Sequence, residues 1–237
     1  MCFSARASFT AAALLLPLGA VAVRHVLGER HASGRLPLAL TPLLFGLQQV
    51  IEGLVWLGLA PDPPPVAGGL LPAASVAYLF FAYGLWPGWM GFIALRWGDV
   101  GRGRHERRWL IGAIAVGVLY GLLLWLPLLL DPPGSIPSVL QGSLHYPVPR
   151  LLPGLIGRLV GQSLYAALIA IPLLLPRGEL RWFGLSVLLS FVLTQLAWAP
   201  TFASVWCFFS AVLSLQIVWI VTRPRPFPGA DAWGGTT

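Results

Sequence analysis

Lysine is absent from this chain of 237 residues, because all fifteen of its basic residues are arginine. Without a lysine amine the chain cannot hold a retinal Schiff base, so a rhodopsin-type pigment protein is excluded. Charged residues are scarce as well: they make up 10% of the chain, against about 25% in soluble domains. Hydrophobic residues make up 57%. The two fractions together exclude an ordinary soluble domain and indicate an integral membrane protein.

Motifs of known catalytic and metal sites are also missing. The sequence contains no HExxH, CxxC, GxSxG or P-loop pattern. Intramembrane zinc hydrolases need several buried histidines and aspartates, but here His25 is the only histidine in an apolar stretch, at its end. Two cysteines cannot form a disulfide framework. We therefore expect no metal site, the sequence names no cofactor, and an enzyme is not the leading expectation.

Long apolar stretches fill most of the sequence. About 20 apolar residues in a helix cross a bilayer core, and seven stretches reach or approach that length. The expected spans are 7–27, 37–60, 70–96, 109–130, 151–175, 182–199 and 201–222.

The arginines sit mainly in alternate gaps between these spans. Counted with Arg24 at the end of the first span, the gaps after the first, third and fifth spans and the tail after the seventh hold eleven arginines, whereas the other gaps hold only Arg150. Arginine-rich loops stay on the cytoplasmic side. We therefore expect an all-α membrane protein, a seven-transmembrane-helix bundle, with the N-terminus outside and the C-terminus cytoplasmic. Its location would be the cell membrane, multi-pass, which is the inner membrane in a bacterium.

Domain organisation and partners follow from the same pattern. Residues 1–222 would form one seven-helix transmembrane domain, and residues 223–237, rich in proline and arginine, a disordered cytoplasmic tail. The net charge of +7 is explained by topology and by anionic lipid headgroups, so no nucleic-acid partner is expected. The expected partners are the lipid bilayer, a small-molecule ligand, and further copies or a membrane complex.

Two opposite charges lie deep in different spans. Glu52 is about 8 residues, roughly 12 Å, below the outer face, and Arg158 is roughly 10 Å below the same face. A charge at the centre of a helix in the bilayer costs at least ~2.5 kcal/mol. Their equal depth therefore predicts an ion pair or a water-filled cavity in the outer half of the bundle.

Further polar residues gather at this depth. Gln48, Gln49 and Trp56 recur with Glu52 at helical spacing on one face of the second span. Polar stripes can instead serve only to hydrogen-bond neighbouring helices together. This group, however, has more polar side chains than such packing requires. The candidate ligand-binding residues are Glu52, Arg158, Gln48, Gln49, Gln195, Trp56, Gln162 and Ser4.

Cys2 is a separate candidate. Removal of the initiator methionine would leave a cysteine with both a free amine and a thiol. Such a group could act as a nucleophile, bind a metal, or form a disulfide with Cys207 in an oxidising outer compartment. The plain alternatives are a small residue at a helix start or a simple covalent staple.

Packing signals and one long loop complete the pattern. Gly84 with Gly88, Gly117 with Gly121, and Gly157 with Gly161 are small-xxx-small pairs, which predict close helix contacts. Pro87 should kink the third span. The loop 131–150 is too rich in proline for a helix and is expected to cap the outer face.

The opening Met1-Cys2-Phe3-Ser4 and the pattern Gln49-x-x-Glu52-x-x-x-Trp56 resemble a large uncharacterised family of multi-pass membrane proteins. Its bacterial members begin Met-Cys-Phe-Ser, and a similar group in algae and giant viruses begins Met-Cys-Trp-Ser. The family has no assigned activity. The resemblance implies that Cys2, Ser4, Gln49, Glu52 and Trp56 belong to one site.

Three functions are compatible with the sequence. The leading hypothesis is a protein that binds or transports a small solute through an outward-facing polar cavity around Glu52 and Arg158. The second is an intramembrane thiol enzyme or redox protein that uses Cys2, with or without Cys207. The third is a structural subunit of a larger membrane complex, in which the polar residues only pack.

Overall fold

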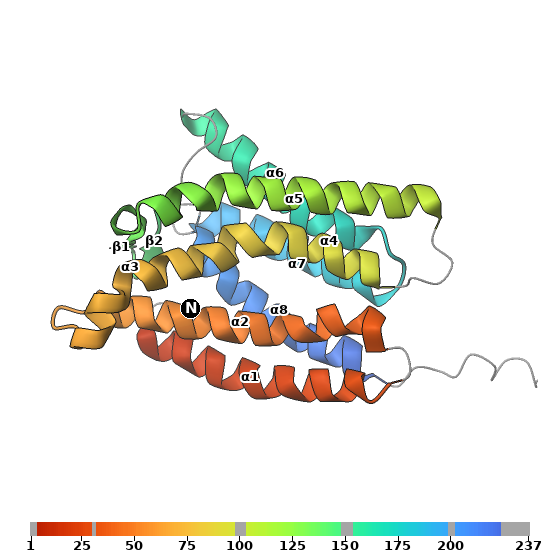
Figure 1. Ribbon diagram of the computed structural model, residues 1–237, viewed down its shortest axis with the longest axis horizontal. Coiled ribbons are helices and arrows are strands. Elements are labelled where there is room, and N and C mark those ends of the chain that lie inside the picture. The colour runs from red at the N-terminus through yellow and green to blue at the C-terminus, as the bar shows by residue number, and fades with distance from the viewer. Residues whose placement is uncertain (1–3, 30–31, 98–102, 148–153, 199–201, 224–237) are drawn as a thin grey trace, which may run out of the picture.

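The computed structural model describes residues 4–29, 32–97, 103–147, 154–198 and 202–223, and these are overwhelmingly helical. The helices run roughly parallel to the long axis of one bundle (Figure 1). They are α1 (Ala5–Leu27), α2 (Ala32–Gly58), α3 (Pro65–Leu79), the π-helical turn η1 (Phe80–Leu85), α4 (Trp86–Arg96), α5 (Arg104–Leu130), α6 (Gly154–Leu174), α7 (Glu179–Trp198) and α8 (Phe202–Thr222).

Several of these helices suit a lipid environment. Within the described residues, five helical stretches are long and apolar enough to cross a membrane, and the third of them joins α3, η1 and α4 into one stretch, Pro65–Arg96. The described apolar parts of α6 and α8 are shorter. The expectation of a predominantly helical protein, with helices long and apolar enough to span a membrane, is thus confirmed. The count of seven spans and the orientation of the termini stay predictions.

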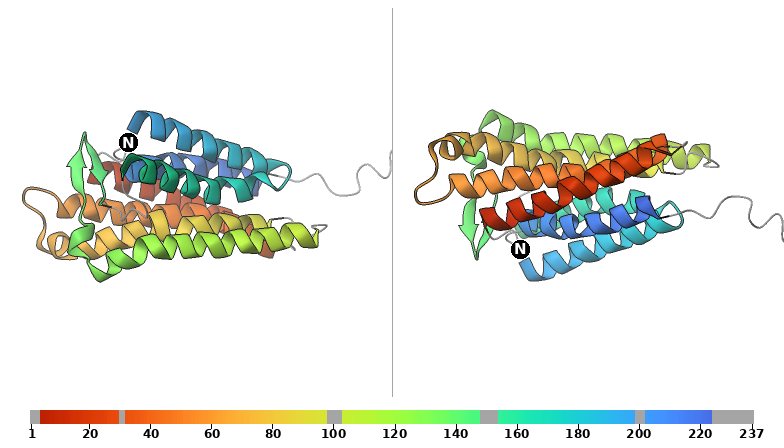
Figure 2. Two further views of the ribbon diagram at one scale, coloured as in Figure 1. Left: turned by 90° about the horizontal axis from the view of Figure 1, so that it is seen from above. Right: turned by 90° about the horizontal axis from the view of Figure 1, so that it is seen from below.

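The two ends of the bundle differ in charge. The ends of α1, α4, α6 and α8 and the starts of α2, α5 and α7 lie together at one end, and the α2–α3 turn lies at the other (Figures 1 and 2). Nearly all described arginines on these helix ends, such as Arg24, Arg96 and Arg104, belong to the first end. This is the distribution on which the expected orientation rests.

Helix α2 is the central element of the bundle, since it contacts α1, α3, α4 and α8. Its contact with α1 is antiparallel and close. A Cβ atom on Gly46 would lie 2.8 Å from a carbon of Leu16, and one on Gly53 would lie 2.6 Å from the ring of Phe9. This register brings the start of α1, including Ser8, level with Glu52.

The expected close contact is confirmed for the first two of the three glycine pairs, whereas a Cβ atom on Gly161 would meet only the hydroxyl of Tyr120, at an ordinary 3.7 Å. A Cβ atom on Gly117 would lie 2.5 Å from the carbonyl oxygen of Pro87, and one on Gly121 would lie 2.6 Å from that of Gly84. Helix α5 therefore packs directly on the backbone at the junction of η1 and α4.

The irregularity expected at Pro87 takes the form of the π-helical turn that precedes it. In π pairing the carbonyl of Ala82 would accept from the residue five positions on, which is Pro87 and has no N–H. The hydroxyl of Tyr165 on α6 donates to this carbonyl instead. The turn thus links α6 to the α3–α4 stretch.

The loop 131–150 contains a short 3₁₀ turn, η2 (Pro133–Ser135), and a β-hairpin of β1 (Ser138–Leu140) and β2 (Ser143–His145). Positive φ angles at Gln141 (50°) and Gly142 (74°) match the tight turn of such hairpins. The buried ring of Tyr146 stacks on Tyr78 at 4.8 Å. The hairpin therefore packs on the end of the bundle that carries the α2–α3 turn (Figure 1).

Candidate functional site

The polar residues of α2 lie in the interior of the bundle. Gln48, Gln49 and Glu52 are all 0% exposed. The side-chain amide of Gln49 donates to Oε2 of Glu52 at 3.1 Å, one helical turn away. Gln48 faces α4, where its Oε1 accepts from the indole Nε1 of Trp86 at 3.1 Å. We call Gln48, Gln49 and Glu52 the polar layer.

Two polar atoms near the polar layer are buried without a partner. Ser8 is 0% exposed, and among the described residues nothing hydrogen-bonds its Oγ. The same holds for the indole Nε1 of Trp56, four residues after Glu52. A buried polar atom without a hydrogen bond is costly, and a water or a ligand is one explanation for it. Ser8 offers a donor and an acceptor, and Trp56 offers a donor.

Gln162 and Gln195 form a separate pair. The amide of Gln195 on α7 donates to Oε1 of Gln162 on α6 at 2.7 Å. The Oε1 atom of Gln195 is buried and has no partner in the described part of the chain. This pair therefore joins α6 to α7 and keeps one acceptor unused.

The remaining expected site residues fall into two groups. Ser4 is exposed, and its Oγ caps α1 by accepting from the backbone N–H of Ala7 at 3.2 Å. Cys2 lies outside the described residues, as do the side chains of Arg158 on α6 and Cys207 on α8. The Glu52–Arg158 pair, the thiol pair and a ligand contact at Ser4 therefore stay predictions.

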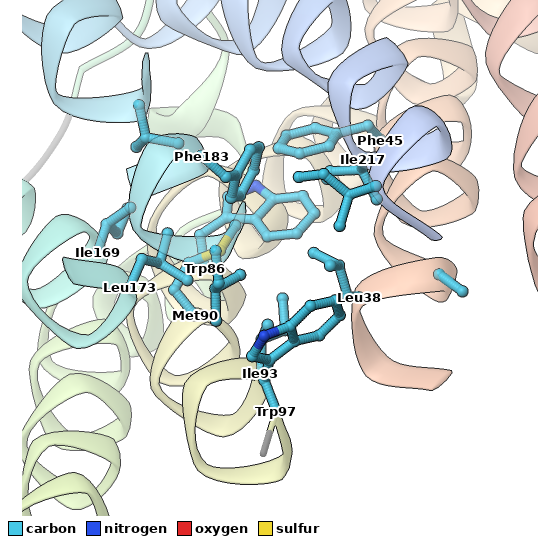
Figure 3. Close-up of a cluster of buried hydrophobic side chains, with 14 of the residues drawn as sticks. Leu38, Phe45, Trp86, Met90, Ile93, Trp97, Ile169, Leu173, Phe183 and Ile217 are labelled. Atoms are coloured by element: carbon cyan, nitrogen blue, oxygen red, sulfur yellow. The ribbon is translucent and has the colours of Figure 1, made fainter. Parts of the chain in front are cut away.

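An aromatic pocket adjoins the polar layer on its arginine-rich side. Five rings line it, together with four aliphatic or thioether side chains. Figure 3 shows five of the lining residues side by side: Phe45 from α2, Trp86 and Met90 from α4, Ile169 from α6 and Phe183 from α7. Its volume is about 20 Å³. The lining residues are Phe45, Trp86, Met90, Tyr165, Ile169, Phe183, Val187, Trp206 and Leu213.

Sequence reasoning missed this pocket. Its rings lie on α2, α4, α6, α7 and α8, and aromatic residues in apolar spans are ordinary core residues. The single available signal was the helical spacing between Phe45 and Glu52, which places the two on one face of α2.

Sequence reasoning also placed Arg35 wrongly, in the gap before the second span. Helix α2 begins at Ala32, so Arg35 lies within its first turn, and only 7% of Arg35 is exposed. Its Nη1 contacts Glu29 at 2.7 Å, and its Nη2 donates to the carbonyls of Ile220 (3.1 Å) and Val221 (2.8 Å) at the end of α8. The guanidinium lies 5.9 Å from the ring centre of Trp97. Arg35 thus ties together α1, α2, α4 and α8.

The polar layer offers one carboxylate and two side-chain amides inside an apolar bundle. The unpaired Oγ of Ser8 and Nε1 of Trp56 add hydrogen-bonding capacity near it. Among the residues that the structure describes, no three His, Cys, Asp or Glu side chains gather closely enough to hold a metal ion.

Comparison with other proteins places the chain in a family. No curated protein and no solved structure matches it. A family model described as "Family of unknown function (DUF6629)" matches residues 1–231, which confirms the expectation of an uncharacterised family. The relation of the opening motif to algal and viral proteins stays a prediction. Since the match covers nearly the whole chain, the protein belongs to the family of unknown function DUF6629.

Proposed function

We propose that this protein is an integral membrane protein that binds or transports a small solute through an outward-facing polar cavity, which contains the polar layer. The proposal includes seven spans formed by residues 1–222, an outer N-terminus and a cytoplasmic C-terminus. The solute would enter from the end that carries the hairpin, because Glu52 lies nearer to that end of α2.

One observation carries this proposal. Glu52 is a fully buried carboxylate in a helix that is long and apolar enough to span a membrane, and unpaired polar atoms of Ser8 and Trp56 lie near it. Ionisable groups inside the membrane are expensive and mark solute, ion or proton pathways. A purely structural layer would be expected to satisfy its own hydrogen bonds.

Arg158 completes the proposed site as the counter-charge of Glu52. If the two charges pair, removal of one would strand the other at a cost of roughly 3–5 kcal/mol. Glu52→Gln and Arg158→Gln should then each lower the melting temperature. The double variant should recover part of the loss, whereas strictly additive shifts would contradict the pairing.

The test of binding is to identify what the purified protein retains. The wild type, Glu52→Gln and the matched control Glu179→Gln, at the start of α7, are purified in mild detergent and denatured. Mass spectrometry then quantifies the small molecules that are released. We expect the wild type and Glu179→Gln to release the same compound, and Glu52→Gln to release much less of it. Equal amounts from all three proteins, or no retained compound, would count against the proposal.

The thiol function stays an alternative, although no described residue favours it. Its test is Cys2→Ser in the same experiment. Loss of the retained compound from this variant, with Glu52→Gln unaffected, would favour the thiol site over the polar layer.

A further inference from the structure

The aromatic pocket presents almost no hydrogen-bonding capacity to a ligand. Its polar side-chain atoms are two indole N–H groups and one hydroxyl, and all three donate to protein acceptors. Trp86 donates to Gln48 at 3.1 Å, Trp206 donates to Ser190 at 3.0 Å, and Tyr165 donates to the carbonyl of Ala82. None of the nine lining residues carries a formal charge at neutral pH. An anion or a strongly hydrated metal ion would therefore lose its water shell in this pocket without gaining a partner.

Two kinds of ligand remain, a neutral apolar molecule and a weakly hydrated organic cation. In a membrane the lipid tails compete for a neutral apolar molecule, because they are as apolar as the pocket. They do not compete for a cation, whereas aromatic rings attract one through their negatively polarised faces. Five of the nine lining side chains are aromatic. The pocket therefore offers a cation the negatively polarised ring faces that lipid tails lack.

The surrounding charge points in the same direction. Phe45 precedes Glu52 by seven residues, so it shares a face of α2 with Glu52 and lies about 10 Å from it along the helix axis. The ring of Phe45 stacks on Trp86 at 4.0 Å, and Trp86 is hydrogen-bonded to Gln48 of the polar layer. A buried carboxylate and an aromatic wall are therefore parts of one connected structure.

We propose that the aromatic pocket binds a small alkylated ammonium ion, which makes organic cations the solute class of this protein. This inference rests on the proposed function, since it names what the polar layer and the pocket would receive together. The volume of about 20 Å³ is little more than one water molecule needs, so even a methylated ammonium ion requires the wall to move. Met90, a flexible side chain at the pocket wall, can change its conformation to make that room, and the cation should have few carbon atoms.

The experiment compares a cation with a neutral molecule of similar shape. Trimethylammonium and tert-butanol are titrated into the full-length purified protein in detergent micelles, and ligand-observed NMR gives each dissociation constant, with empty micelles as the blank. Phe183→Leu removes one ring from the pocket but keeps it apolar. The matched control is Phe92→Leu, because Phe92 is 37% exposed and does not line the pocket. Melting temperatures verify that each variant is folded.

We expect the wild type and Phe92→Leu to bind trimethylammonium at least about fivefold more tightly than tert-butanol. Phe183→Leu should weaken trimethylammonium binding about fivefold, the change that corresponds to one cation–π contact, and should leave tert-butanol unchanged. Met90→Phe, which fills the pocket without removing a ring, should abolish cation binding and serves if Phe183→Leu does not fold. Equal affinity for the two molecules, or cation binding that neither pocket variant weakens, would overturn the inference.

The outcome can be separated from that of the proposed function. If Glu52→Gln loses the compound that the wild type retains while the pocket variants keep it, the polar layer is the site and the pocket inference fails. If the pocket binds trimethylammonium but Glu52→Gln retains the same compound as the wild type, the proposed function of the polar layer fails.

Discussion

At the scale of single residues, Arg35 shows how much a buried charge depends on its partners. Its guanidinium contacts both carboxylate oxygens of Glu29 and two carbonyls that end α8. Carbonyls at a helix C-terminus carry partial negative charge, which a cation stabilises. The side chain therefore pairs with a partly exposed carboxylate and with two backbone carbonyls at this end of the bundle.

Replacing Arg35 should destabilise the protein. Arg35→Gln would remove the guanidinium from the carboxylate of Glu29 and from the carbonyls of Ile220 and Val221, at a cost of about 1–3 kcal/mol. The matched control is Arg24→Gln, because Arg24 lies in the last turn of α1 and is exposed. Thermal unfolding in detergent measures both, and an equal melting temperature for the two variants would show that Arg35 has no special role.

At the scale of elements, the contact of α5 with the η1–α4 junction decides the shape of this part of the bundle. The backbone of α5 reaches the carbonyls of Gly84 and Pro87 because two of its residues have no side chain. The same junction supplies Trp86 to the aromatic pocket and the Ala82 carbonyl to Tyr165. A shift of α5 would therefore reach the pocket through the junction.

Gly117→Ala should separate these two elements. The new methyl group would lie 2.5 Å from the carbonyl oxygen of Pro87, and relief of the clash should cost about 1–3 kcal/mol. Gly112→Ala in the same helix is the control, since a Cβ atom there meets nothing within 4 Å. It should be neutral or slightly stabilising, because alanine favours a helix over glycine. Equal unfolding curves for the two variants would mean that α5 can move away at no cost.

At the scale of the whole molecule, the bundle has two unlike ends. One carries most of the described arginines, and the other carries the hairpin and the α2–α3 turn (Figure 2). An arginine-rich end is retained in the cytoplasm during insertion. The charge difference therefore predicts the orientation of the bundle, and with it the side from which the polar layer is reached.

Labelling of single cysteines checks this orientation. In a background with Cys2→Ser and Cys207→Ser, a membrane-impermeant thiol reagent should label Ser138→Cys in intact cells. It should label Gly103→Cys only after the membrane is permeabilised. Both positions are exposed, so failure to react would report on the side of the membrane. The reverse pattern would invert the topology and place the hairpin in the cytoplasm.

The sequence by itself determined the class of the protein and the positions of its helices. In hydrocarbon each backbone N–H and C=O group needs a hydrogen-bond partner within the protein, and a helix supplies these partners locally. Long apolar stretches of this composition therefore form helices, whichever neighbours they later pack against. Glu52 and its neighbouring glutamines were recognisable as a polar group for a related reason. A polar side chain at that depth is energetically costly, so it is expected to be paired or to have a function. The glycine pairs were readable because close helix approach requires small residues.

Only the tertiary structure decided which side chains meet. Hydropathy fixes how deep a residue lies but not the rotation of its helix or its lateral neighbours. The bond of Gln48 to Trp86, the burial of Arg35 against α8 and the five rings around one pocket were therefore not readable. The hairpin was missed for a local reason, since its strands are three residues each and its turn depends on positive φ angles at Gln141 and Gly142. The depth of a residue in the membrane depends on its own segment. A side-chain contact depends on two helices, and it forms only when those helices pack together.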